Sequence, residues 1–283
     1  MSKLHSNLAR RVISALLLFP LLVWVSWLGG LPFALVLAGA AAVAALELTQ
    51  MFTETGFPEY FGVAVAGLLP IAPWWTFQSG HRAHAQLVPV ILAVAAMVLL
   101  VLNLFRPESL ERAPARVAAS SLAWLYCGVL ISTVVGIRVH FGFAWVILAF
   151  VVSWMNDIFA YFAGRLFGRK PFYPKVSPKK TWEGFAGGVL GSVLGAVGTK
   201  AVFLLAPQPR GESFHISFAG CVGLALGASV LGPVGDLVES MLKRAAGRKD
   251  SGNIIPGHGG LLDRIDAVLF IAPWIYLWAR LVQ

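Results

Sequence analysis

The sequence predicts an all-α membrane protein, a polytopic transmembrane helical bundle of about nine spans with its N-terminus in the cytoplasm. Of its 283 residues, 58% are hydrophobic and only 12% are charged, whereas soluble domains carry about 25% charged residues. The mean hydropathy is +0.77. Nine apolar stretches approach the roughly 20 residues that cross a bilayer as a helix. They are residues 8–28, 31–52, 60–78, 85–105, 117–137, 141–168, 184–206, 216–243 and 263–282.

The distribution of positive charge predicts the topology. A net charge of +9 is compatible with a nucleic-acid binder, but the cations lie between apolar stretches, so we expect no nucleic-acid partner. With the N-terminus inside, 17 Lys and Arg residues fall on the cytoplasmic side and 5 on the other. Cytoplasmic loops of membrane proteins carry such an excess. The charged loops near 169–183 and 244–262 then share the cytoplasmic face of what we expect to be the inner membrane.

The two halves of the chain differ in composition, and we expect two functional regions. Residues 1–140 are rich in Ala, Leu and Val with few internal polar residues, which is typical of lipid-facing scaffold helices. Residues 141–283 carry glycines at four-residue spacing, as in Gly187, Gly191 and Gly195. Small residues at this spacing let helix backbones approach closely in lipid. We expect this second region, with its cytoplasmic loops, to be catalytic.

The first polar constellation lies in the stretch 141–168. Asp157, Tyr161 and Arg165 recur at i, i+4 and i+8, so they share one face of a helix. An ionised carboxylate within a span is costly and usually marks a functional site. Two interpretations stay open: an interhelical hydrogen bond or ion pair, and a role in binding metal or substrate.

The second constellation is the basic loop 175–184, which precedes a Gly-rich helix. Hydroxyls and ammonium groups are concentrated there, on Ser177, Lys179, Lys180 and Thr181. A helix N-terminus adds free N–H groups and a favourable dipole for an anion. The loop could also be an ordinary cytoplasmic loop, but these donors favour binding of a phosphate or a lipid headgroup.

The third constellation is a polar stripe on an otherwise apolar helix. Asp236, Glu239, Ser240 and Lys243 fall at i, i+3, i+4 and i+7, and Arg244 follows. Glu239 and Lys243 are spaced to neutralise each other. Asp236 is then left without a partner, and an unpaired carboxylate this deep is expensive.

The fourth constellation is the charged segment that leads into the last apolar stretch. It holds Lys249, Asp250, the turn Pro256-Gly257-His258-Gly259-Gly260, and then Asp263, Arg264 and Asp266. The glycines let exposed N–H groups approach an anion. Several Asp oxygens with few His or Cys ligands suit a hard cation such as Mg²⁺, which usually arrives with substrate phosphates.

Together these residues gather carboxylates and cations at one face of the membrane. Carboxylates hold Mg²⁺, and the metal and the cations neutralise phosphate oxygens. The pattern therefore favours phosphoryl or nucleotidyl transfer to a lipid. Walker-type, dinucleotide-binding, Ser-His-Asp and zinc-protease motifs are missing from the sequence.

The unbroken segment from Ser240 to Asp266 resembles the signature of the CDP-diacylglycerol synthase family, also called phosphatidate cytidylyltransferases. The Asn156-Asp157 motif and the loop 175–184 also resemble family segments. The resemblance implies an attack by the phosphate of phosphatidic acid on the α-phosphorus of CTP, which yields CDP-diacylglycerol and pyrophosphate. It further implies dependence on Mg²⁺, with room for a second cation, and formation of homodimers.

The resemblance also implies a role for each matching residue. The metal ligands would be Asp236 and Asp263, with Asp157, Asp250 and Asp266 as further ligands or orienting groups. Lys243, Arg244 and His258 would join Asp236 and Asp263 in catalysis, His258 as acid, base or hydrogen-bond donor. Substrate would be bound by Tyr161, Ser177, Lys179, Lys180, Thr181, Ser240, Lys249 and Arg264.

Two other functions use similar chemistry. A CTP-dependent lipid kinase of the dolichol or phytol type needs the same metal and cations, but it would transfer the γ-phosphate. A transporter of phosphorylated solutes also uses charges within the membrane, but its polar residues would be spread through both halves of the chain.

Overall fold

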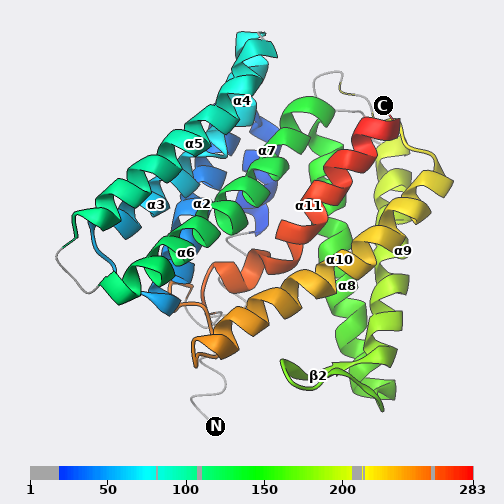
Figure 1. Cartoon of the computed structure of the whole chain (residues 1–283). Helices are drawn as coiled ribbons and strands as arrows, with labels where there is room; N and C mark the ends of the chain where they lie inside the picture. Colours follow the sequence, from blue (N-terminus) through cyan, green and yellow to red (C-terminus); the bar gives the residue numbers. More distant parts are fainter. Residues whose placement is uncertain are drawn as a thin grey trace. The chain divides into compact units, whose positions relative to one another are not determined.

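The computed structural model describes residues 19–80, 82–106, 110–205, 212, 214–255 and 259–282, and helices dominate it (Figure 1). Six helices in this part of the chain are long and apolar enough to cross a membrane, or seven if a bent pair counts as one span. The all-α polytopic membrane fold is therefore confirmed. The count of nine spans and the cytoplasmic N-terminus stay predictions.

The chain divides into two compact units. The first unit comprises Met1–Val139 and Asp250–Arg264, and the second comprises His140–Lys249 and Ile265–Gln283. The segment 250–264 thus belongs with the N-terminal helices, although it lies far from them in the sequence. The functional division between 1–140 and 141–283 stays a prediction.

The first unit is built from short and long apolar helices. After an apolar helix Phe19–Leu28, it contains α2 (Gly30–Phe52), α3 (Phe57–Leu68), α4 (Ile71–Ser79), α5 (Arg82–Leu104), the 3₁₀ turn η1 (Leu110–Arg112), α6 (Ala113–Ala123), the π-helical turn η2 (Trp124–Val129) and α7 (Leu130–Phe141). The predicted stretch 60–78 is two helices bent by 45°. Pro70 stands at the break as the N-cap of α4, where its missing N–H costs no helical hydrogen bond.

A buried ion pair holds α3 to the end of α5. Glu59 is fully buried, and Arg106 Nη1 lies 2.7 and 2.8 Å from its two carboxylate oxygens. Glu59 Oε2 also accepts a hydrogen bond from the Gly56 N–H at 2.9 Å, which caps α3. One carboxylate therefore fixes both the start of its own helix and a neighbouring element.

The described residues of the second unit form four long helices and one hairpin. They are α8 (Phe143–Phe167), β1 (Pro171–Tyr173), β2 (Ser177–Thr181), α9 (Trp182–Leu205), α10 (Phe218–Ala245) and α11 (Leu262–Val282), which begins in the first unit. Glycines bring α9 against α8, as their spacing predicts: a Cβ at Gly187 would lie 2.8 Å from the carbonyl oxygen of Phe159. Asn156 Nδ2 then reaches Ser192 Oγ at 2.9 Å and ties the two helices together.

Glycines also bring α10 against the second-unit part of α11. A Cβ at Gly223 would lie 2.7 Å from the Trp278 ring. A Cβ at Gly235 would lie 2.6 Å from the carbonyl oxygen of Asp266. Trp274 Nε1 donates to the carbonyl oxygen of Leu224 at 2.9 Å. The helices can approach this closely only because glycine has no side chain.

The predicted basic loop 175–184 is in part a strand. β2 pairs antiparallel with β1, and Figure 1 shows the hairpin at the end of the second unit where α8 ends and α9 begins. The residues of β2 are Ser-Pro-Lys-Lys-Thr, which lack the apolar alternation that identifies a strand in a sequence. The strand partner β1 instead supplies the apolar contact, because the ring of Phe172 packs against Trp182 and Phe185 at the start of α9.

Replacing Arg106 with Met should destabilise the first unit, because it leaves the buried carboxylate of Glu59 without its cation. Breaking one side of a buried pair costs about 3–5 kcal/mol. The double variant Glu59→Gln/Arg106→Met should lose less stability than the sum of the two single variants. Thermal unfolding of the detergent-solubilised protein measures this, and additive losses would contradict it.

Candidate functional site

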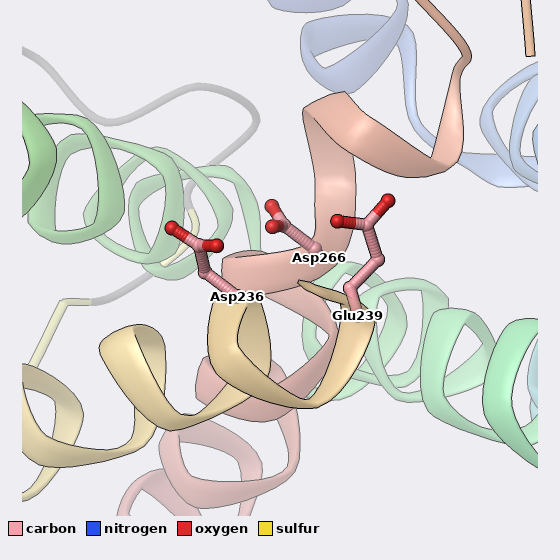
Figure 2. Close-up of side chains that lie close together, drawn as sticks. All are labelled: Asp236, Glu239 and Asp266. Carbon is pink, nitrogen blue, oxygen red and sulfur yellow. The ribbon is translucent and has the colours of Figure 1, made fainter. Parts of the chain in front are cut away.

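Three carboxylates converge in the second unit, from Asp236 and Glu239 on α10 and Asp266 on α11 (Figure 2). One oxygen from each lies within 4.8 Å of the others. Asp236 and Glu239 share a face because they are three residues apart on one helix. Asp266 joins them because Gly235 allows α11 to approach α10 at this level. Like charges this close repel, so the cluster requires positive charge.

Two lysines supply part of that charge. Lys180 Nζ lies 2.8 Å from Asp236 Oδ2 and 3.3 Å from the carbonyl oxygen of Pro233. Lys243 forms an ion pair with Glu239 one turn away, as their spacing predicts. The expectation that Asp236 lacks a partner was wrong, because the hairpin brings Lys180 to it. Sequence spacing cannot reveal a partner that lies 56 residues away.

The acidic cluster is suited to a hard divalent cation. Its ligand atoms are carboxylate oxygens, which Mg²⁺ and Ca²⁺ prefer. Ligands about 2.1 Å from a Mg²⁺ ion lie within about 4.2 Å of one another. Neighbouring ligands lie about 3 Å apart, so the three oxygens, which lie within 4.8 Å of one another, would draw together around a bound ion.

A different carboxylate holds the described residues on either side of Pro256-Gly257-His258. Asp263 Oδ2 accepts hydrogen bonds from the Ser251 N–H at 2.9 Å, the Ser251 hydroxyl at 3.0 Å and the Gly260 N–H at 2.9 Å. Gly259 has a φ of +83°, which suits glycine and allows this tight turn. Asp263 therefore closes the turn at the start of α11, and its predicted metal contact stays a prediction.

The predicted face of α8 is present. Arg165 Nη1 donates to the Tyr161 hydroxyl at 2.9 Å, and both side chains are exposed at the surface of the chain. Asp157 is close enough to Asp266 for a direct charge interaction. This face therefore adds an exposed acidic group within electrostatic range of Asp266.

The remaining predicted residues fall into three groups. Ser240 and Thr181 have structural contacts: Ser240 Oγ lies 3.2 Å from Asp236 Oδ1, and Thr181 Oγ1 caps α9 by accepting from the Gly184 N–H at 3.1 Å. Ser177 is half-buried in β2, whereas the exposed side chains are those of Lys179, Arg244, Lys249, Asp250 and Arg264. His258 lies outside the described residues. Substrate contacts by all of these residues stay predictions.

Sequence reasoning missed Glu239 as a member of the cluster. Its spacing to Lys243 suggested simple neutralisation, and that pair is present. The signal that could have identified it is its position one turn from Asp236, on the same stripe. A residue can form an ion pair and also face a metal site, because a carboxylate has two oxygens.

The fold and this cluster define a polytopic membrane protein with an acidic centre that could hold a metal ion. Comparison with known proteins then identifies it more closely. The profile of the cytidylyltransferase family matches residues 9–282, and the chain belongs to this family. It is consequently an enzyme, a nucleotidyltransferase.

The similarity to individual relatives runs along nearly the whole chain. It is 31% identical to the phosphatidate cytidylyltransferase of Bacillus subtilis, covering 95% of this chain and 97% of the relative. The proteins of the same name from Brucella abortus and Thermotoga maritima are each 31% identical, over 98% of this chain and over 94% and 98% of the relative. The lipid-kinase alternative is not favoured by these relatives.

The lysine pairing predicts opposite effects of two substitutions on cation binding. Asp266→Asn should weaken binding of Mn²⁺ by about tenfold or more, because it removes a charged ligand. Lys180→Met should strengthen Mn²⁺ binding in the absence of nucleotide, because it removes a cation 2.8 Å from Asp236. Electron paramagnetic resonance of the purified protein titrated with Mn²⁺ measures both. Weaker binding by Lys180→Met would contradict the assignment of the cluster as a cation site.

Proposed function

We propose that this protein is a phosphatidate cytidylyltransferase, which condenses CTP with phosphatidic acid to give CDP-diacylglycerol and pyrophosphate for phospholipid biosynthesis. The observation that carries the proposal is the similarity, over nearly the full length, to relatives of that name. The carboxylates and lysines gathered in the second unit support it, because they suit a metal-bound triphosphate.

In the reaction, a phosphate oxygen of phosphatidic acid forms a bond to the α-phosphorus of CTP. The bond from the α-phosphorus to the bridging oxygen of the β-phosphate breaks, and its electron pair leaves with pyrophosphate. The attacking phosphate is already anionic, so it requires no general base. Catalysis then depends on positioning and on stabilisation of charge.

Asp236, Glu239 and Asp266 would hold Mg²⁺, with Asp157 and Asp263 orienting that centre or holding a second cation. The ion supplies Lewis-acid stabilisation of phosphate oxygens when bound. The three carboxylates fit that role in number and in donor type.

The cations of the site would bind the phosphates. Lys180 and Lys243 are already held beside the cluster by Asp236 and Glu239, so they are positioned before substrate arrives. Arg244, Lys249 and Arg264 are exposed and would take the outer phosphates of CTP. Lys179, next to Lys180 on β2, would meet the headgroup of phosphatidic acid.

We further propose the inner membrane as the location, with the site at its cytoplasmic face. The excess of cations in the loops assigned to that side supports this orientation, and CTP is found there. Partners would be CTP, phosphatidic acid and the lipid bilayer, and a homodimer is the expected assembly.

The test uses the purified full-length chain with phosphatidic acid, CTP and Mg²⁺. Label from α-³²P-CTP should enter the lipid, while label from γ-³²P-CTP should appear in pyrophosphate. Entry of the γ-label into a lipid alcohol would instead identify a lipid kinase. Removal of divalent cations with EDTA should abolish turnover, and added Mg²⁺ should restore it.

Asp236→Asn and Asp263→Asn should each lower kcat by at least about 100-fold, as loss of one preorganised charge in a site does. Asp236→Asn removes a carboxylate of the acidic cluster, and Asp263→Asn weakens the turn that begins α11. Pyrophosphate release measures the loss, and an unchanged elution profile confirms that the variant is folded. Full activity of either variant would exclude that residue from the site.

A further inference from the structure

Glu47 is a buried carboxylate in a helix that the sequence assigns to the scaffold. It is the one charged residue of α2 (Gly30–Phe52), and it is only 3% exposed. An ionised group in such a position needs strong hydrogen bonds or an opposite charge to offset its loss of water. The contacts of Glu47 show where that compensation comes from.

Its hydrogen bonds come from the segment that leads into α11. Glu47 Oε1 accepts from the Leu261 N–H at 3.0 Å, and Oε2 accepts from the Leu262 N–H at 2.9 Å. Ser251 Oγ lies 3.0 Å from Oε2. Leu262 is the first residue of α11, and the first N–H groups of a helix have no partner within it. Glu47 therefore caps α11 from another helix.

The segment is shaped to receive this carboxylate. A Cβ at Gly252 would lie 2.6 Å from Glu47 Oε1, and a Cβ at Gly260 would lie 2.5 Å from Oε2. Both glycines thus leave the space that the carboxylate fills. A side chain at Gly252 would displace Glu47, and one at Gly260 would displace Ser251 as well as Glu47.

Ser251 links Glu47 to Asp263. The Ser251 hydroxyl lies 3.0 Å from Glu47 Oε2 and 3.0 Å from Asp263 Oδ2, and its own N–H donates to Asp263. A hydroxyl has one proton, so it donates to one carboxylate at a time while the backbone N–H groups hold both. The two carboxylates therefore hold the same turn, through Ser251 and through the successive N–H groups of residues 260–262.

We infer that Glu47 is a positioning residue for catalysis. By holding Ser251 and the backbone of Leu261 and Leu262, it fixes the turn that carries Asp263 at the start of α11. The inference rests on the proposed function, since it concerns residues proposed to handle metal and nucleotide. The N-terminal region then holds Asp263, a proposed site residue, in place and does not serve only as a scaffold.

The test compares Glu47→Gln with two control variants in the full-length purified protein. Glutamine has nearly the same shape, but an NH₂ group replaces one of the two carboxylate oxygens. That NH₂ group would face the N–H of Leu261 or Leu262, which would then lose its acceptor. Glu59→Gln is the control for loss of a buried carboxylate elsewhere in the first unit. Glu54→Gln, at an exposed position just after α2, is the control for charge alone.

Two measurements are made on each variant. Hydrogen exchange followed by mass spectrometry should show faster exchange in peptides covering 250–262 for Glu47→Gln, and no change there for either control. Glu47→Gln should also lower kcat about 10–100-fold and raise the Mg²⁺ concentration for half-maximal activity, as loss of a group that orients metal ligands does. Glu47→Asp keeps the carboxylate on a shorter side chain. Relative to Glu47→Gln, it should restore part of the exchange protection at 250–262 and part of the activity.

Unchanged exchange at 250–262 in Glu47→Gln would overturn the inference. So would faster exchange with unchanged kcat and Mg²⁺ dependence, or a loss of activity that only follows loss of folded protein, as in Glu59→Gln. If the wild-type chain forms no CDP-diacylglycerol, the proposed function fails and the catalytic inference falls with it. The exchange data then decide separately whether Glu47 holds the segment.

Discussion

The cost of removing a carboxylate from water is the constraint on which the rest of this structure depends. The helices are apolar enough to cross a membrane, and an uncompensated charge there is costly. Each buried carboxylate accordingly has a defined partner: Arg106 for Glu59, Lys243 for Glu239, and a set of backbone and hydroxyl donors for Glu47. The contacts of Glu59 and Glu47 join segments that are distant in the sequence, whereas the Glu239–Lys243 pair lies within α10.

The same constraint explains why the acidic cluster suits a metal-bound nucleotide. Lys180 and Lys243 balance Asp236 and Glu239 within the protein. A divalent cation would take over the carboxylates, and the triphosphate would take over the lysines. Each carboxylate would exchange a lysine for the metal ion, and each lysine would exchange a carboxylate for a phosphate. Substrate binding would then leave none of these charges without an opposite charge. Such an exchange costs little reorganisation, because the lysines already lie beside the cluster.

Much of the fold and part of the site follow from the sequence, for reasons that particular residues make clear. Apolar runs and the glycine spacing predict the helices and the approach of α9 to α8, because they depend on local sequence. The i, i+4 pair of Glu239 and Lys243 is local as well. By contrast, Lys180 reaches Asp236 only through a hairpin with no apolar alternation. Contacts between distant segments depend on tertiary packing, which spacing along one chain cannot show.

Glu47 had a sequence signal, since it is the one charge in α2. A helix that only supports its neighbours needs no carboxylate there, because apolar groups of similar size are often as stabilising as buried charges or more so. What a carboxylate offers is the ability to accept several hydrogen bonds at fixed angles, here from Ser251, Leu261 and Leu262. Those donors belong to the turn that begins α11. The hydrogen bonds of Glu47 therefore fix the position of that turn. A reaction that depends on positioning and charge is sensitive to placement errors of about 1 Å, which is why we expect loss of Glu47 to lower turnover.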